Sequence, residues 1–322
     1  MQVTNIHNRL IKEKAQEMGI ICEPLIPGLE DILLLDNGIK RIYINKTRSN
    51  KLPFISGFLS TNKVATNILL RDAGLPIPHF CLVQAYSVEA ESFLRQHAPL
   101  VVKPFNTNRG VGIVMNIRDP LELQAAIEHA LSFSSHVILQ EQAEGRDYRI
   151  LVIDKTVVGV LETCPPSVTG DGVSTIQELI ERANQDPRRG TKDQNTPLMH
   201  IPIDQPLILH LQSLQLQLSS ILPLGELVQV RLNSNDFTGG ANIDRTDEIC
   251  MENIDIAIKA ADLLGIDVAG IDLRCPHISQ PVSITGGGII EVNVLPGMDS
   301  HVLPSEGKSR DVIGAYLRYL FQ

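Results

Sequence analysis

The segment Gly286-Gly-Gly-Ile-Ile-Glu-Val-Asn-Val-Leu-Pro-Gly297 carries the residue pattern that decides the fold. It predicts an apolar strand with a carboxylate, Glu291, and an amide, Asn293, two residues apart. Side chains two apart on a strand point to the same face, so these two can converge on one ion. Upstream, residues 265–273 (Gly-Ile-Asp-Val-Ala-Gly-Ile-Asp-Leu) predict a second buried strand, which carries another carboxylate, Asp272.

The three side chains are oxygen donors, and few cysteine or histidine residues lie near them in the sequence. Such a donor set suits Mg²⁺, which prefers oxygen ligands and keeps phosphate and water in the rest of its shell. Taken alone, the pattern fits a capped strand end with a solvated acid equally well, because acids at strand ends are common. The segments upstream favour the metal site.

Composition and charge limit the classes of protein that fit this chain. The 322 residues are 43% hydrophobic and 20% charged, enough for a large core in one elaborate domain or in two to three small ones. The net charge of −9 argues against a general nucleic-acid or membrane-surface binder, although local Lys and Arg can still surround an anionic nucleotide. The apolar runs are too short to span a membrane, and the polar first ten residues lack a signal-peptide core. We therefore expect a cytoplasmic protein with no nucleic-acid or membrane partner.

The cysteines point the same way. They are five in number, scattered, and without CxxC spacing: Cys22, Cys81, Cys164, Cys250 and Cys275. This usage favours buried free thiols in a reducing compartment, and a disulfide framework or a zinc site fits it poorly.

Helical and strand patterns intermix along the chain without strict alternation, which predicts an α+β or mixed α/β fold. Helices are expected over residues 61–73, 207–219 and 251–264, and strands over 100–103, 113–117, 136–141 and 227–232. A hairpin is expected across the Asp154-Lys155 turn.

The segment around Lys103 has the features of a phosphate site. Lys103 ends an apolar strand, and a polar loop with glycines, Phe105–Gly112, follows it. Glycines let backbone N–H groups approach phosphate oxygens, and Lys103, with Arg109, would add positive charge. Neither the GxxxxGK[ST] nor the GxGxxG motif is present. The alternative is a plain hairpin with a lysine that reaches to solvent.

The run His136–Arg149 predicts a strand that turns through Gly145 into a second strand. The strand edge can offer backbone donors and acceptors to an adenine, Asp147 can bind ribose hydroxyls, and Arg149 would point toward phosphate or a substrate carboxylate. The alternative is a surface hairpin in which an Asp–Arg pair contributes little. Lys63 adds to the nucleotide interpretation, because a cation at a helix start is disfavoured by the helix dipole unless an anion binds there.

In this order, the pieces resemble the ATP-grasp superfamily. The likeness is closer to one branch, the ATP-grasp portion of cyanophycin synthetases and the glutathione-synthetase half of bifunctional glutamate–cysteine ligase/glutathione synthetases. It rests on four long motifs in the right order, which are more specific than any single one. The motifs are TGDGVSTIQELIERANQDPRRG (169–190), VRLNSNDFTGGANIDRTDE (230–248), LLGIDVAGIDL (263–273) and GGGIIEVNVLPGMDSHVLPSEG (286–307). The likeness runs from about residue 15 to the C-terminus.

The resemblance implies an ATP-grasp fold, in which two α+β subdomains clamp ATP. A short N-terminal region, residues 1–60, would precede the ATP-grasp domain, residues 61–322, whose lid subdomain would cover about 98–145. It also implies a ligase reaction. ATP phosphorylates a carboxylate, an amine attacks the acylphosphate to form an amide, and ADP and phosphate leave. The expected substrates are amino acids or short peptides, the expected ions are two Mg²⁺ with Mn²⁺ as a substitute, and the expected assembly is a homodimer or tetramer.

The resemblance assigns a role to each matching residue. The residues that contact or cover the ATP phosphates would be Lys63, Lys103, Asn106, Thr107, Asn108, Arg109, Gly110 and Gly112. Those that hold adenine and ribose would be Gln140, Glu141, Gln142, Ala143 and Asp147. The metal ligands would be Asp272, Glu291 and Asn293, and the residues that stabilise the acylphosphate or a substrate carboxylate would be Arg149 and Arg231. The substrate contacts would be Asn235, Thr238, Gly239, Gly240 and His301, and a structural role fits His301 equally well.

Departures from the relatives leave the substrates open. No Mur-ligase-like domain follows Gln322 in this sequence, and only about 60 residues precede Lys63, so we expect a stand-alone ligase for an amino acid or short peptide. Gly270 stands where D-alanine–D-alanine ligases carry an arginine. Two other interpretations stay open: a non-catalytic ATP-binding module, regulatory or part of a larger synthetase, and a ligase that acts on a protein or peptide.

Overall fold

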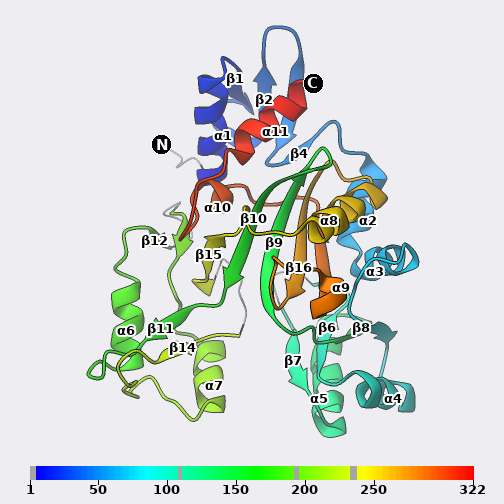
Figure 1. Ribbon diagram of the computed structural model, residues 1–322, viewed down its shortest axis with the longest axis vertical. Helices are drawn as coiled ribbons and strands as arrows, with labels where there is room; N and C mark the ends of the chain where they lie inside the picture. The colour runs from blue at the N-terminus through cyan, green and yellow to red at the C-terminus, as the bar shows by residue number, and fades with distance from the viewer. Residues whose placement is uncertain (1–4, 108–110, 192–195, 233–237) are drawn as a thin grey trace. The chain divides into compact units, whose positions relative to one another are not determined.

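The computed structural model describes residues 5–107, 111–191, 196–232 and 238–322 (Figure 1). Four predicted site residues, Asn108, Arg109, Gly110 and Asn235, lie outside these ranges. The chain forms two compact units, one of residues 51–157 and 248–296, the other of residues 1–50, 158–247 and 297–322. Each unit contains helices and sheets, which confirms the mixed α/β expectation. No helix in the described part of the chain is long and apolar enough to cross a membrane.

The unit of residues 51–157 and 248–296 contains two antiparallel sheets. Its helices are α2 (Phe54–Thr61), α3 (Lys63–Asp72), α4 (Val88–His97), α5 (Pro120–Leu131), α8 (Met251–Leu263) and α9 (Val282–Thr285). The first sheet has the order β5-β8-β6-β7, made of β5 (Phe80–Val83), β6 (Leu100–Pro104), β7 (Val114–Ile117) and β8 (Val137–Glu141). In the second, β16 (Val268–Cys275) pairs with both β9 (Arg146–Ile153) and β17 (Gly288–Asn293).

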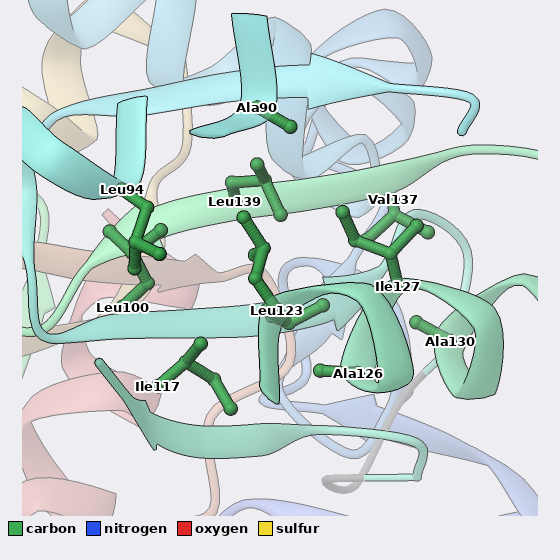
Figure 2. Close-up of a cluster of buried hydrophobic side chains, with 11 residues drawn as sticks. Ala90, Leu94, Leu100, Ile117, Leu123, Ala126, Ile127, Ala130, Val137 and Leu139 are labelled. Atoms are coloured by element: carbon green, nitrogen blue, oxygen red, sulfur yellow. The ribbon is translucent and has the colours of Figure 1, made fainter. Parts of the chain in front are cut away.

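Helices α4 and α5 pack on one face of the β5-β8-β6-β7 sheet and bury an apolar cluster there (Figure 2). The sheet contributes alternate residues, among them Leu100, Val102, Val137 and Leu139, all completely buried. Each such side chain stabilises the fold by roughly 1.5–3 kcal/mol relative to an exposed one. Because side chains alternate along a strand, the residues between them point to the opposite face of the sheet.

The other unit contains the N-terminal sheet β1-β2-β3-β4 and three strand pairs. Its strands are β1 (Ile21–Ile26), β2 (Leu29–Asp36), β3 (Arg41–Asn45), β4 (Arg48–Ser49), β10 (Thr156–Cys164), β11 (Ser167–Thr169), β12 (Arg189–Gly190), β13 (Leu198–Met199), β14 (Leu227–Gln229) and β15 (Ala241–Asp244). The pairs are β10 with β15 and β11 with β14, both antiparallel, and β12 with β13, parallel. Its helices are α1 (Ile6–Glu17), α6 (Ile176–Ala183), α7 (Gln205–Ser213), α10 (Asp299–Val302) and α11 (Val312–Phe321).

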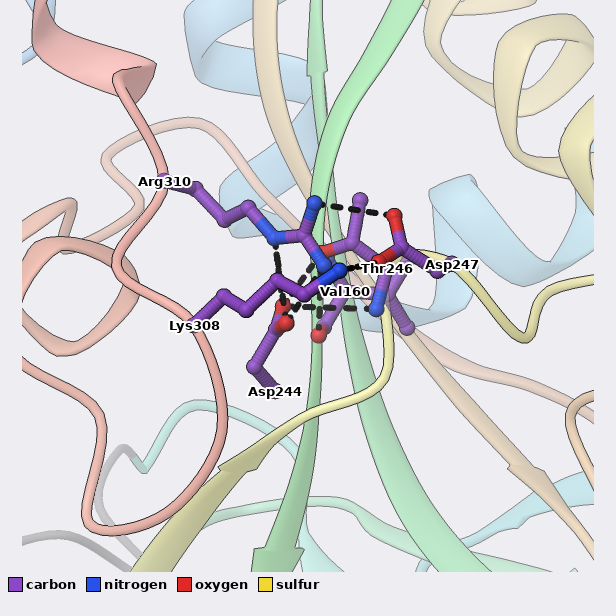
Figure 3. Close-up of polar contacts among 6 residues, drawn as sticks. All are labelled: Val160, Asp244, Thr246, Asp247, Lys308 and Arg310. Carbon is purple, nitrogen blue, oxygen red and sulfur yellow. Dashed lines mark hydrogen bonds and ion pairs between the residues drawn. The ribbon is translucent and has the colours of Figure 1, made fainter.

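A network of charged side chains ties the segment before α11 to the end of β15 (Figure 3). The Arg310 guanidinium donates from Nε (3.0 Å) and Nη2 (2.6 Å) to the buried Asp244 carboxylate, and from Nη1 to Asp247 (2.9 Å). Lys308 also binds Asp247, at 2.7 Å. Paired, hydrogen-bonded charges of this kind can be buried, whereas a lone charge cannot.

The expected elements differ from the observed ones mainly at their ends. The helix expected over 61–73 is α3, which begins two residues later, at Lys63, because the Asn62 side chain accepts a hydrogen bond from Ala65 N (3.0 Å) and caps it. The preceding helix, α2, ends at Thr61. The helix expected over 207–219 ends at Ser213, because Gln215 adopts a positive φ of 60° that no α-helix accommodates. The strand expected over 227–232 ends at Gln229. Asp154 and Lys155 both have positive φ, as a type I′ hairpin turn requires.

Candidate functional site

Lys103 and Gln140 lie on the face of the β5-β8-β6-β7 sheet that α4 and α5 leave uncovered. Lys103 follows Val102 and Gln140 follows Leu139, and both of these apolar residues belong to the helix-covered cluster. Gln140 pairs with Val101 where β6 and β8 lie side by side. The Lys103 ammonium donates to the side-chain oxygen of Gln140. The Gln140 side chain is 2% exposed and its Nε2 has no hydrogen-bond partner among the described residues. A buried donor without an acceptor destabilises the fold unless a partner reaches it.

The charges around Lys103 place the other predicted residues close to it. Burial, followed by the positive charge of Lys63, lowers the pKa of Lys103 to about 8. The Glu291 carboxylate opposes this change, as does Asp147, while Arg274 adds to it. Lys103 therefore lies within the electrostatic reach of both the second lysine and one predicted metal ligand.

The three predicted metal ligands meet where β16 pairs with β17. Asp272 stands opposite Glu291 in the ladder, and Gly270 stands opposite Asn293. The Asn293 amide lies 3.0 Å from the Asp272 carboxylate and donates to it. All three side chains are partly buried. The strand register thus puts the three side chains on one face of the β16–β17 pair.

Arg149 reaches the same place from β9, where it pairs with Asp272. Its guanidinium holds the Asp272 carboxylate with two hydrogen bonds, one from Nε and one from Nη2 (3.0 Å). Gly270 makes room for this contact, since a Cβ there would lie 3.1 Å from Arg149 Cδ and 2.9 Å from Pro296 Cβ. The glycine that departs from the D-alanine–D-alanine ligase pattern is therefore required by the position of Arg149.

Lys63 is the first residue of α3 and links the metal ligands to the polar loop. Its Nζ lies 3.8 Å from Glu291 Oε1 and donates to the carbonyl of Thr107 at 3.1 Å. Thr107 Oγ1 in turn donates to the carbonyl of Val111 (2.8 Å). Gly112 ends the loop with φ of 73°, and a Cβ there would lie 2.7 Å from Pro104 Cγ. Only glycine fits that position, whereas Asn106 is exposed.

The residues predicted to hold adenine and ribose lie at the end of β8, in the turn after it and at the start of β9. The Gln142 N–H donates to the carbonyl of Pro99 (2.9 Å), and its side-chain oxygen accepts from Asn116 N (2.8 Å). Ala143 and Glu141 are partly buried. Asp147 forms an ion pair with Arg274 at 3.3 Å.

The predicted substrate contacts that the structure describes belong to the other unit. Arg231 is 5% exposed and binds the carboxylate of Asp204 and the carbonyl of Pro202 (3.2 Å). Gly239 accepts a hydrogen bond from Arg189 at its carbonyl (2.9 Å). Thr238 is partly buried and Gly240 is buried. His301 is completely buried, and a Cβ on Gly159 would lie 2.6 Å from its Nδ1, which favours the structural alternative for this histidine.

Sequence reasoning missed two partners in the nucleotide part of the site. Gln140 was expected to help hold adenine, and the contact of its side chain with Lys103 was not foreseen. Arg274 was not singled out, although its charge lowers the pKa of Lys103 and it pairs with Asp147. Arg274 is two residues beyond Asp272 on one strand, so its side chain points to the same face as that of Asp272. This spacing was the sequence signal that could have identified Arg274.

Comparison with known proteins shows what the chain is similar to. Residues 60–171 match the RimK-like ATP-grasp domain. A bifunctional glutathione synthetase from Pasteurella multocida has a similar crystal structure, with a TM-score of 0.76 and 29% identity over 99% of this chain and 44% of that one. D-alanine–D-alanine ligase from Bacillus anthracis is similar in fold alone, with a TM-score of 0.50 and 15% identity over 84% of this chain and 69% of that one. The chain has an ATP-grasp fold.

Two curated relatives are similar over most of this chain. Cyanophycin synthetase of Synechocystis sp. is 39% identical over 291 residues, 89% of this chain and 33% of the relative. The glutathione biosynthesis bifunctional protein GshAB of Listeria innocua is 33% identical over 321 residues, 98% of this chain and 41% of the relative. The ATP-grasp chain described here thus spans well under half the length of each relative.

Proposed function

We propose that this chain is an ATP-dependent carboxylate–amine ligase that forms an amide between amino acids or short peptides through an acylphosphate, releasing ADP and phosphate. One observation carries the proposal. Two lysines and three oxygen donors from four different elements converge in one unit, with Lys103 within reach of the charges of Lys63 and Glu291. A reaction between ATP and a carboxylate brings two anions together, so it needs such a cluster of cations and metal ligands.

The donor set fits a magnesium ion. Asp272, Glu291 and Asn293 offer hard oxygen atoms from paired strands, and no cysteine is among them. The Asn293 amide donates to Asp272 in its assigned orientation, and a flip of that amide would turn its oxygen toward the same place. The ion would neutralise charge on the phosphate oxygens. Mn²⁺ has the same ligand preference, and two ions are proposed.

The protein's own groups would do the rest by positioning and charge. Lys63 and Lys103 would hold the ATP phosphates, and the loop that ends at Gly112 would exclude water from the acylphosphate. Arg149, already aligned by Asp272, would stabilise negative charge on the transferred phosphoryl group. Arg231 and the turn Thr238–Gly240 are proposed as contacts for the substrate carboxylate. No covalent protein nucleophile is required.

A screen of amino acids and dipeptides in pairs, with ADP formation and product mass as readouts, tests the proposal. At least one pair should stimulate ADP release and give the mass of an amide. Asp272→Asn should abolish this turnover while the fold survives. Asp255→Asn is the matched control, because Asp255 is an exposed carboxylate on α8 and its loss should leave turnover unchanged.

Three outcomes would contradict a part of the proposal. Full turnover in Asp272→Asn would remove the metal assignment. ATP binding without turnover across the whole screen would favour the non-catalytic ATP-binding module, and an acceptor captured as a covalent adduct of a macromolecule would favour a protein or peptide substrate. Sedimentation of the purified chain tests the homodimer or tetramer that the relatives led us to expect.

A further inference from the structure

A second group of metal-ligating side chains lies in the same unit, and one of its members, Glu141, is also among the residues predicted to hold adenine. His79, His97 and Glu141 each offer one ligand atom, and these atoms lie within 4.8 Å of one another. His79 directly precedes β5, His97 is the last residue of α4 and Glu141 is the last residue of β8. His79 is exposed and the other two are partly buried, so an ion from solvent can reach them.

Backbone contacts hold two of the three residues in register. The Glu141 N–H donates to the carbonyl of His79 (2.8 Å), and the His79 N–H donates to the Glu141 carboxylate (3.3 Å). The His97 ring lies between the rings of His79 and Phe93, with centroids 4.5 Å and 4.6 Å away. The three side chains are therefore held in place by contacts at the ends of secondary-structure elements.

The strand alternation separates this cluster from the nucleotide residues. Glu141 is two positions beyond Leu139, so its side chain leaves the sheet on the face that α4 and α5 cover. Gln140, which binds Lys103, leaves on the opposite face. A ligand of the His79–His97–Glu141 cluster would thus occupy the reverse side of the strand that leads into the proposed adenine segment.

We propose that His79, His97 and Glu141 bind one divalent transition-metal ion of the Zn²⁺ class, with water as the fourth ligand. Two imidazole nitrogens and one carboxylate oxygen are a donor set for Zn²⁺, Co²⁺ or Ni²⁺, whereas Mg²⁺ prefers oxygen alone. A tetrahedral ion with bonds of about 2.0–2.2 Å needs donors about 3.4 Å apart, so the side chains would close by roughly 1 Å through small rotations. His97 also lies at the C-terminal end of a helix, where the dipole favours a cation.

Bound metal would join the entry of β5, the end of α4 and the end of β8, and would stabilise the folded state by mass action. Titration of the full chain with Zn²⁺ and with Co²⁺, in excess Mg²⁺, tests the site by calorimetry and by the visible absorption of Co²⁺. We expect one equivalent of ion, a raised melting temperature, and a Co²⁺ spectrum of tetrahedral type. His79→Ala and His97→Ala should each weaken binding at least tenfold.

His129→Ala is the matched control, because His129 lies on α5 in the same unit and outside the cluster, and it should bind Co²⁺ as the unaltered chain does. If His97→Ala fails to fold, Glu141→Gln, which keeps the side-chain size, gives the same test. Binding that survives loss of either histidine would overturn the proposal. A Co²⁺ signal that disappears in Asp272→Asn would also overturn it, because the ion would then occupy the proposed magnesium site.

Discussion

Lys103 is partly buried near another cation, and its lowered pKa leads to a prediction about pH. Burial, and after it the charge of Lys63, lower the pKa of Lys103 from 10.5 to about 8. Below pH 8 the ammonium is charged and ready for phosphate, and above pH 8 that charge is lost. A bound phosphate favours the charged form, so nucleotide binding near pH 8 should take up a proton, and affinity should fall by up to about tenfold per pH unit above 8.

Calorimetry with ADP in two buffers of different ionisation enthalpy measures this proton uptake. Lys103→Arg should bind without it, because an arginine stays charged throughout the range. The same lysine also affects stability. Between pH 8 and 10.5 the unfolded chain binds more protons at this residue than the folded chain does, so its contribution makes the folded state more stable as pH rises through that window. A pH dependence of ADP binding that persists unchanged in Lys103→Arg would contradict the assignment.

Gly270 leads to a second prediction for a single residue. In Gly270→Ala the new Cβ would contact Arg149 Cδ and Pro296 Cβ at 3.1 Å and 2.9 Å, distances at which neighbours must shift. We expect a loss of about 1–3 kcal/mol of unfolding free energy from overpacking, and a loss of turnover as Arg149 leaves Asp272. Urea unfolding measures the first and ADP release the second. Gly57→Ala is the control, since the nearest atom there is the end of the flexible Leu52 side chain and the change should be neutral or stabilising.

At the scale of elements, local patterns predicted most helices and strands but not their partners. The apolar run before Asn293 predicts a strand by itself, and Asp119 followed by Pro120 marks the start of α5 with a side-chain cap and a proline at the first turn. The contact of Lys103 with Gln140 depends on how β6 pairs with β8, and that register is set by residues far apart in the sequence. For the same reason, the two histidines and the glutamate of the second cluster could not be found from spacing.

The Arg310 network supports an element-scale prediction. Arg310→Met would leave the buried Asp244 carboxylate without its guanidinium, and removal of one partner of a buried pair costs about 3–5 kcal/mol. We expect Arg310→Met to lower the unfolding free energy by about 3 kcal/mol in urea titrations. Asp247→Asn is the comparison, because Asp247 is largely exposed and its loss should have a much smaller effect. Equal effects of the two variants would show that burial of Asp244 is not the cause.

That network should also respond to acid. Burial by itself raises the pKa of Asp244, but hydrogen bonds from Arg310 and Thr246 lower it overall, below its ordinary 3.8. The stability that Asp244 contributes is therefore complete above that ordinary value and is lost as pH falls through the folded-state pKa. In Arg310→Met that contribution is already lost, so the unfolding free energy of the variant should fall less with acid than that of the unaltered chain, as urea titrations at a series of acidic pH values would show.

At the scale of the whole molecule, the compact units divide the chain at places that no local pattern marks. One unit combines residues 1–50 with two later segments, and the expected boundary near residue 60 stays a prediction. The described residues proposed for nucleotide and metal all belong to the unit of residues 51–157 and 248–296, and those proposed for the substrate belong to the other. Binding of nucleotide and reaction of substrate can therefore be separated by substitution.

Two variants should show opposite defects. Arg231→Lys keeps the nucleotide residues, so MgATP should raise its melting temperature as in the unaltered chain, while amino-acid-stimulated ADP release falls at least a hundredfold. A ligand present at 100 times its Kd stabilises the folded state by about 2.7 kcal/mol. Asp272→Asn should lose the Mg²⁺-dependent part of the rise in melting temperature, because it should no longer bind the ion. Thermal unfolding with and without MgATP, beside the turnover assay, checks both. If Arg231→Lys lost the MgATP effect as well, nucleotide binding would not belong to one unit, and the assignment of Arg231 to the substrate would fail.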